Sequence, residues 1–143
     1  MDEFMKREII LDNYQNPRHF GNPNDNNYVK VNMNSKSCID EINIYLKLNN
    51  NVVEDLMFDG EACAICTSSA SIMTDLIIGK TKDEALNIIN NYYKMIDEKD
   101  YDKDILKEAL VYDTIYKQPN RIKCATLSWQ GLEKALVGDK DGE

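Results

Sequence analysis

The sequence predicts an α+β fold in which a small three-stranded antiparallel sheet packs against several helices. One helical segment opens the chain, three segments with period-two alternation follow it, and further helical patterns fill the rest. The chain has 143 residues, 43% of them hydrophobic, and no long biased tract. We therefore expect a single domain that spans residues 1–143.

The first helix is expected over about residues 2–14, because apolar side chains recur there at helical spacings. Asn16-Pro17 would end this helix, since proline cannot continue it. The apolar face that we predict for it consists of Phe4, Ile9, Ile10, Leu11 and Tyr14.

Three strands are predicted next, over about residues 29–33, 42–48 and 52–58. Apolar side chains recur at every second position in much of each segment, which is typical of a strand with one buried face. Asn49-Asn50-Asn51 predicts the turn between the last two strands. The pattern indicates an antiparallel meander.

Helical patterns return after the third strand. An apolar stripe over residues 65–77 ends at Gly79 and predicts a helix that begins just after Cys63. Thr81 and Glu84 form a capping-box pattern at the start of the next helix.

The last helix is expected over about residues 121–137, after a short helical pattern in residues 102–112 and a break at Pro119. Cys124 would then lie in its first turn. There, unpaired backbone N–H groups and the helix dipole would stabilise the thiolate and lower the pKa of Cys124.

Four side chains from distant parts of the chain form a candidate metal site. Thiolates select Zn²⁺ or the iron of iron-sulfur clusters, whereas a carboxylate is a harder ligand that exchanges more easily. One weak ligand among three strong ones indicates chemistry at the metal or at a ligand sulfur. The four predicted ligands are Cys38, Asp40, Cys63 and Cys124.

Cys66 leaves two other interpretations open, because it forms a C-x-x-C pair with Cys63. Cys66 could replace Asp40 as the fourth ligand, or the two cysteines could form a redox dithiol at a helix start. A thioredoxin-like site would need a surrounding βαβ pattern, which is absent from the sequence. His19, the one histidine, is expected to be a surface turn residue.

Composition excludes several classes of function. A formal net charge of −8 argues against a nucleic-acid partner, and neither of the common glycine-rich phosphate-binding motifs occurs. The N-terminal residues contain no apolar stretch of the length that a signal peptide or membrane helix needs. We therefore expect a cytoplasmic location and no membrane partner, and cysteines that serve as ligands rather than as disulfides.

Arg121 and Lys123 are candidate positive groups beside the metal site. Three thiolates and one carboxylate around a divalent ion leave a formal charge of −2, which a nearby cation would stabilise. The alternative is that both are ordinary solvated residues at a helix start.

Several motifs resemble the U-type iron-sulfur cluster assembly proteins. ILDNYQNPR (10–18) resembles the N-terminal helix of that family and the turn after it, and FDGEACAI (58–65) its second-cysteine loop. SSASIMT (68–74) resembles the helix that follows this loop. RIKCATL (121–127), followed by Trp129, is similar to the third-cysteine helix.

Two features resemble the SufU-type branch of the family. Lys123 stands where scaffold members usually have histidine, and residues 82–113 look like an additional helical segment of that branch. The resemblance implies one U-type domain with a SufE/NifU-like fold, and a SufS-type cysteine desulfurase as partner. It also implies Zn²⁺ bound by Cys38, Asp40, Cys63 and Cys124.

The resemblance further implies a zinc-dependent sulfurtransferase in iron-sulfur cluster assembly. Cys38 would be the catalytic residue that accepts persulfide sulfur, and Arg121 would stabilise the displaced ligand. Apo iron-sulfur proteins or a downstream scaffold would receive the sulfur. One alternative is a scaffold that assembles a [2Fe-2S] cluster on the same four ligands. Another is a non-catalytic adaptor in which zinc only supports the fold.

Overall fold

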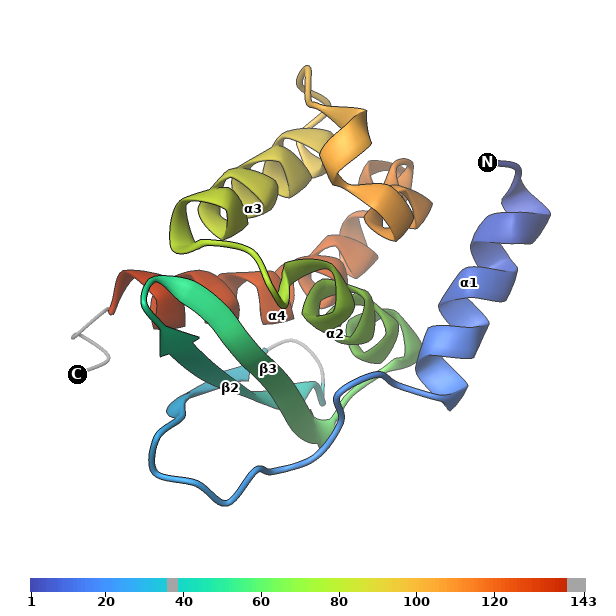
Figure 1. Ribbon diagram of the computed structural model, residues 1–143. Helices are drawn as coiled ribbons and strands as arrows, with labels where there is room; N and C mark the ends of the chain where they lie inside the picture. Colours follow the sequence, from blue (N-terminus) through green and yellow to red (C-terminus); the bar gives the residue numbers. More distant parts are fainter. Residues whose placement is uncertain (36–38, 139–143) are drawn as a thin grey trace.

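The computed structural model describes residues 1–35 and 39–138, and in it helices cover one face of a three-stranded sheet (Figure 1). This arrangement confirms the predicted α+β class. The elements in chain order are α1 (Glu3–Gln15), β1 (Val29–Asn34), β2 (Glu41–Asn49), β3 (Val52–Glu61), α2 (Ala64–Ile77), α3 (Lys82–Ile96), the 3₁₀ helices η1 (Lys103–Ile105), η2 (Lys107–Tyr112) and η3 (Ile115–Lys117), and α4 (Pro119–Val137).

The sheet is an antiparallel meander in the order β1-β2-β3. Ile44 at its centre pairs with Val31 on one side and with Phe58 on the other. Asn50 and Asn51 both have positive φ, 53° and 64°, in the turn between β2 and β3. Asparagine tolerates this conformation better than most residues, so the predicted turn is confirmed.

Helix α4 lies directly against the buried face of the sheet. A Cβ on Gly131 would stand 2.8 Å from Met33 Cγ and 3.0 Å from Ile44 Cγ1, so glycine allows this close approach. Trp129 on the same helix is completely buried. The sheet thus fixes the depth of the helix that carries Cys124.

The apolar face predicted for α1 is wrong in part. Phe4, Leu11 and Tyr14 are 68%, 43% and 44% exposed, and only Ile9 and Ile10 pack against the core. The helical periodicity of α1 was correctly recognised. Spacing alone did not show which side of the helix meets the rest of the protein.

Polar contacts hold α1 in place together with the packing of Ile9 and Ile10. The buried Lys6 donates to Asp113 at 2.6 Å, and Ser71 Oγ on α2 donates to Asn13 Oδ1 at 2.6 Å. The Ser71–Asn13 bond is buried and the Lys6–Asp113 pair is partly buried, so both orient the helix more firmly than fully exposed pairs would.

The later helices follow the predicted order with shifted boundaries. Thr81 and Glu84 form the predicted capping box, with bonds of 3.1 and 2.9 Å. The short helical pattern in residues 102–112 forms the 3₁₀ helices η1 and η2. Helix α4 begins at Pro119, two residues earlier than expected, because proline suits the first position of a helix. None of the helices in the described part of the chain has the length and apolar character needed to cross a membrane.

Gly60 should be intolerant of substitution, because it lies in β3 opposite Ile42 with φ of +125°. A Cβ there would stand 2.2 Å from the carbonyl oxygen of Glu41. We expect Gly60→Ala to combine about 1–3 kcal/mol of conformational strain with about 1–3 kcal/mol from steric overlap. Gly79→Ala is the control, because Gly79 also has positive φ but has open space around it. Chemical denaturation of both variants measures the difference, and equal losses of stability would contradict the expectation.

Candidate metal centre

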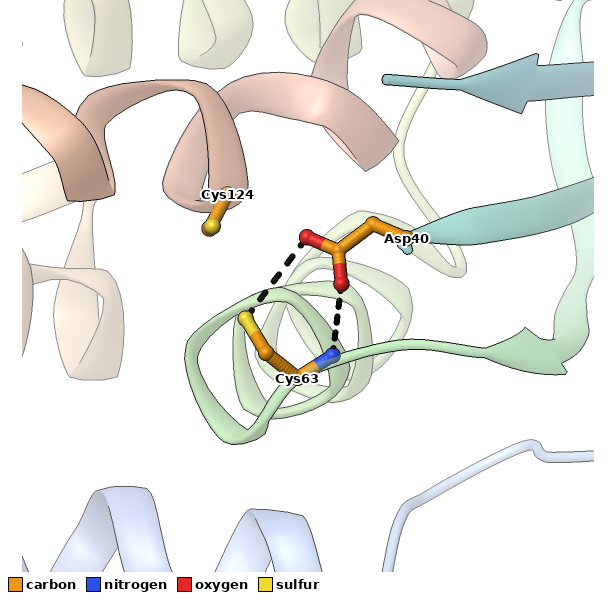
Figure 2. Close-up of side chains that lie close together, drawn as sticks. All are labelled: Asp40, Cys63 and Cys124. Atoms are coloured by element: carbon orange, nitrogen blue, oxygen red, sulfur yellow. Dashed lines mark hydrogen bonds between the residues drawn. The ribbon is translucent and has the colours of Figure 1, made fainter. Parts of the chain in front are cut away.

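Folding brings together three of the four side chains predicted as ligands. Asp40, Cys63 and Cys124 each offer one ligand atom, and these atoms all lie within 4.8 Å of one another (Figure 2). Asp40 precedes β2, Cys63 precedes α2 and Cys124 lies within α4. Cys38, the fourth predicted ligand and the predicted sulfur acceptor, lies outside the described residues.

The two carboxylate oxygens of Asp40 have different surroundings. Oδ1 accepts a hydrogen bond of 2.6 Å from the backbone N–H of Cys63. Oδ2 lies 3.6 Å from Cys63 Sγ, on the side where the sulfurs gather (Figure 2). Asp40 is only 1% exposed, so these contacts replace water around the carboxylate. One oxygen is fixed by the protein, and the other is positioned to bind a metal.

Cys63 is the N-cap residue of α2. Its Sγ accepts the backbone N–H of Cys66 at 3.4 Å, the position at which serine or aspartate commonly caps a helix. The positive end of the helix dipole also favours negative charge on this sulfur. Cys63 lies at the helix start that the sequence predicts, but its bond to the N–H of Cys66 was not predicted, although the helix-start position could have indicated it.

Cys124 lies deeper in its helix than predicted. Because α4 begins at Pro119, Cys124 falls in the second turn, away from the unpaired N–H groups of the first. Burial, and then the neighbouring Cys63 and Asp40, raise the pKa of the Cys124 thiol. The predicted lowering of this pKa is therefore wrong for the metal-free protein, since burial and negative neighbours both disfavour the thiolate.

Cys66 and His19 lie outside the group of ligand atoms. The Cys66 side chain is completely buried in the hydrophobic core, and its backbone N–H donates to Cys63 Sγ. His19 is a turn residue with φ of 56°, and its ring lies 3.5 Å from Asp75. In the described residues it is Asp40, and not Cys66, that meets Cys63 and Cys124.

Arg121 and Lys123 are both exposed near the start of α4. Among the described residues Arg121 forms no ion pair, so the structure does not show the contact with Asp40 that the sequence suggested. Arg121 precedes Cys124 by three positions, a spacing that places two side chains on neighbouring parts of a helix surface.

The donor set fits a thiophilic metal. Two thiolates and one carboxylate suit zinc or iron, and zinc sites commonly have four ligands. Three ligands in the described residues therefore leave a position for a further donor. Asp40, Cys63 and Cys124 are the residues that could hold the metal.

A meander covered by helices, with an aspartate and two cysteines gathered at one end of its strands, defines a small α+β protein with a candidate thiolate metal centre. The NifU-like N-terminal domain family matches residues 5–138, and the chain belongs to this family. The resemblance to the U-type proteins is thus confirmed.

Named relatives cover nearly the whole chain. The zinc-dependent sulfurtransferase SufU of Bacillus subtilis is 42% identical, over 95% of this chain and 92% of the relative. The iron-sulfur cluster assembly scaffold protein IscU of Thermotoga maritima is 37% identical, over 94% of each chain. IscU of Streptococcus pyogenes is 35% identical, over 90% of this chain and 80% of the relative.

Solved structures share the fold. The protein FiSufU from Fervidobacterium islandicum superimposes with a TM-score of 0.83 at 32% identity, covering 90% of this chain and 94% of that one. A NifU-like N-terminal domain from Brucella abortus gives a TM-score of 0.84 at 19% identity, with coverage of 99% and 100%. The second likeness concerns the fold alone.

Proposed function

We propose that this protein accepts and carries persulfide sulfur in iron-sulfur cluster assembly, with zinc as cofactor and a SufS-type cysteine desulfurase as partner. The observation that carries the proposal is the convergence of Asp40, Cys63 and Cys124. The 42% identity to a relative named zinc-dependent sulfurtransferase supports it. We assign this function to one domain that spans residues 1–143.

Cys63, Cys124 and Asp40 would hold the zinc together with Cys38. Bound zinc stabilises the deprotonated form of its cysteine ligands at neutral pH. Asp40 is the harder donor of the set, and its Oδ1 is already engaged by the N–H of Cys63. It therefore modulates the site through a single oxygen.

Cys38 is the sulfur acceptor in this proposal. Its thiolate attacks the terminal sulfur of the desulfurase persulfide. A new S–S bond forms on Cys38, the S–S bond of the desulfurase breaks, and the desulfurase cysteine leaves as a thiolate. The persulfide on Cys38 then passes its terminal sulfur to a downstream scaffold or an apo iron-sulfur protein.

Arg121 would stabilise the ligand that is displaced during this exchange. Its guanidinium is exposed, and its place three residues before Cys124 puts it on the side of α4 close to the site. A guanidinium binds a carboxylate or a thiolate by charge-assisted hydrogen bonds.

The desulfurase assay tests the proposal. The zinc-loaded protein, mixed with a SufS-type desulfurase, cysteine and a reductant, should accelerate sulfide release, and Cys38→Ala should remove the acceleration. A zinc-loaded wild-type sample that produces no acceleration would refute the proposed sulfur transfer.

A scaffold for [2Fe-2S] clusters is the second candidate, supported by the two IscU relatives at 37% and 35% identity. Anaerobic reconstitution distinguishes the two functions. A scaffold would retain iron and sulfide, transfer them intact to an apo-protein, and lose this ability in Cys63→Ala. A protein that holds zinc and transfers only sulfur would not retain iron and sulfide or pass an intact cluster to an apo-protein.

Two substitutions of Asp40 separate its role as a metal ligand from its role as hydrogen-bond acceptor for the N–H of Cys63. Asp40→Asn keeps an oxygen that can accept the N–H of Cys63 but removes the charge, whereas Asp40→Ala removes both. We expect both variants to bind zinc more weakly, and only Asp40→Ala to lose in addition about 1 kcal/mol of metal-free stability. Chelator competition and denaturation measure the two effects.

The same variants test the adaptor alternative. If the wild type transfers no sulfur, and Asp40→Ala loses zinc and folded structure together, zinc serves only to support the fold.

A further inference from the structure

Two buried tyrosines connect the segment over residues 82–112 to the helices that carry the metal ligands. Tyr92 lies in α3 and Tyr112 at the end of η2. This segment supplies none of the three ligand atoms that converge in the described residues. Its two phenol hydroxyls nevertheless end beside α4 and α2.

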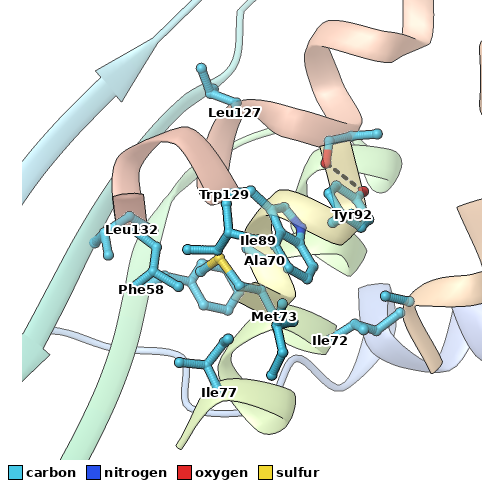
Figure 3. Close-up of a cluster of buried hydrophobic side chains, with 14 of the residues drawn as sticks. Phe58, Ala70, Ile72, Met73, Ile77, Ile89, Tyr92, Leu127, Trp129 and Leu132 are labelled. Carbon is cyan, nitrogen blue, oxygen red and sulfur yellow. Dashed lines mark hydrogen bonds between the residues drawn. The ribbon is translucent and has the colours of Figure 1, made fainter. Parts of the chain in front are cut away.

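Tyr92 forms a hydrogen bond with the residue that follows Cys124. Its hydroxyl donates to the carbonyl oxygen of Ala125 at 2.7 Å, drawn as a dashed line in Figure 3. Ser69 Oγ on α2 donates to the same carbonyl at 2.8 Å, and Trp129 Nε1 donates to Ser69 Oγ at 2.9 Å. Residues from α2, α3 and α4 therefore meet at a single backbone oxygen next to a predicted ligand.

The Tyr92 ring is held in one orientation. It stacks on the indole of Trp129 with a centroid separation of 3.8 Å and an angle of 7° (Figure 3). Both side chains are completely buried. Burial raises the pKa of Tyr92, so the hydroxyl stays protonated and remains a donor.

Tyr112 forms a hydrogen bond with α2, the helix that begins after Cys63. Its hydroxyl forms a buried hydrogen bond with Ser68 Oγ, five residues after Cys63 along α2. The ring also meets Tyr92 edge to face, with centroids 6.4 Å apart. Tyr92 therefore bonds α4 and also lies 3.4 Å from Ser69 Oγ on α2, Tyr112 bonds α2, and the two tyrosines contact each other.

Hydrogen bonds of this kind restrict geometry, because a buried hydroxyl that moves off its partner is left without one. Cys63 and Cys124 belong to different helices, so the distance between their sulfurs depends on how α2 and α4 are held together. Groups that orient ligands without touching the metal commonly change metal affinity by 10–100-fold.

We propose that Tyr92 and Tyr112 are positioning residues for the metal centre, and that their hydroxyls fix α4 and α2 so that Cys63 and Cys124 stay at metal-binding distance. This inference rests on the proposed metal-dependent function. It gives residues 82–112 a role in the site to which they contribute no ligand.

Tyr92→Phe and Tyr112→Phe test the inference, since each removes one hydroxyl and keeps the ring. Tyr93→Phe is the matched control, because Tyr93 donates at 3.0 Å to Glu133 and so joins α3 to α4 nine positions beyond Cys124. Zn²⁺ affinity is measured by chelator competition, the absorption spectrum is recorded with Co²⁺ in place of zinc, and melting of the metal-free proteins is followed separately.

We expect about tenfold weaker Zn²⁺ binding and an altered Co²⁺ spectrum in Tyr92→Phe and Tyr112→Phe, with wild-type behaviour in Tyr93→Phe. If Tyr92→Phe does not fold, Tyr112→Phe decides the case. Wild-type zinc affinity and spectrum in the folded variants would overturn the inference. So would an equal loss of affinity in Tyr93→Phe, because the effect would then follow general stability. A wild-type protein that binds no zinc would instead refute the proposed function itself.

Discussion

Cys63→Ala is expected to purify without zinc and to lose sulfur transfer. Cys63 Sγ lies at the start of α2, where it meets Asp40 and Cys124 and accepts the N–H of Cys66. Alanine removes this ligand and the helix cap in one change. Since zinc can contribute on the order of 10 kcal/mol to a small metal site, losing one thiolate should weaken binding by at least about 100-fold. Metal analysis of the freshly purified variant measures the loss directly.

Cys66→Ala is the matched control, because it removes a second sulfur from the same helix, three residues further along. The Cys66 side chain lies in the hydrophobic core, so this variant should keep its zinc and lose about 1 kcal/mol of stability through the small cavity. The reverse result, zinc lost in Cys66→Ala and kept in Cys63→Ala, would make Cys66 the ligand and contradict the assignment of the site.

Local signals account for the parts of the fold that the sequence predicted. The strands alternate with period two, and the Thr81–Glu84 capping box spans a single helical turn, so each could be read from neighbouring residues. The buried side of α1 could not be predicted from neighbouring residues. Lys6 is buried because it pairs with Asp113, 107 positions away, and no local pattern contains that partner.

The candidate site shows the same division. Cys63 was identifiable because its thiol stands in a turn-like polar stretch, where packing does not explain it. The depth of Cys124 depended on where α4 begins. The carbonyl of Ala125, where Tyr92 and Ser69 meet, carries no sequence signal at all, because any residue has this group. Serines on a buried helix face were the one available hint that hydrogen-bond partners would be found there.

Zinc affinity is expected to rise with pH between about 6 and 8. Burial, and then Cys63 and Asp40, raise the pKa of Cys124 above its ordinary value of 9.0, so zinc must displace a proton from this thiol. Each displaced proton makes affinity rise about tenfold per pH unit. Competition titrations at several pH values, corrected for the protonation of the chelator, measure the slope.

The stability of the metal-free protein should fall with rising pH at alkaline values. The pKa of Cys124 is higher in the folded than in the unfolded chain, so its contribution is present below the unfolded pKa and is lost as pH rises above about 9. The gap in melting temperature between zinc-loaded and metal-free protein should therefore widen as pH rises. In Cys66→Ala, zinc affinity should rise with pH as steeply as in the wild type, because Cys66 is not one of the three converging ligands. An affinity that stays flat from pH 6 to 8 would mean that the site binds zinc without releasing protons, and that Cys124 is already ionised in the metal-free protein.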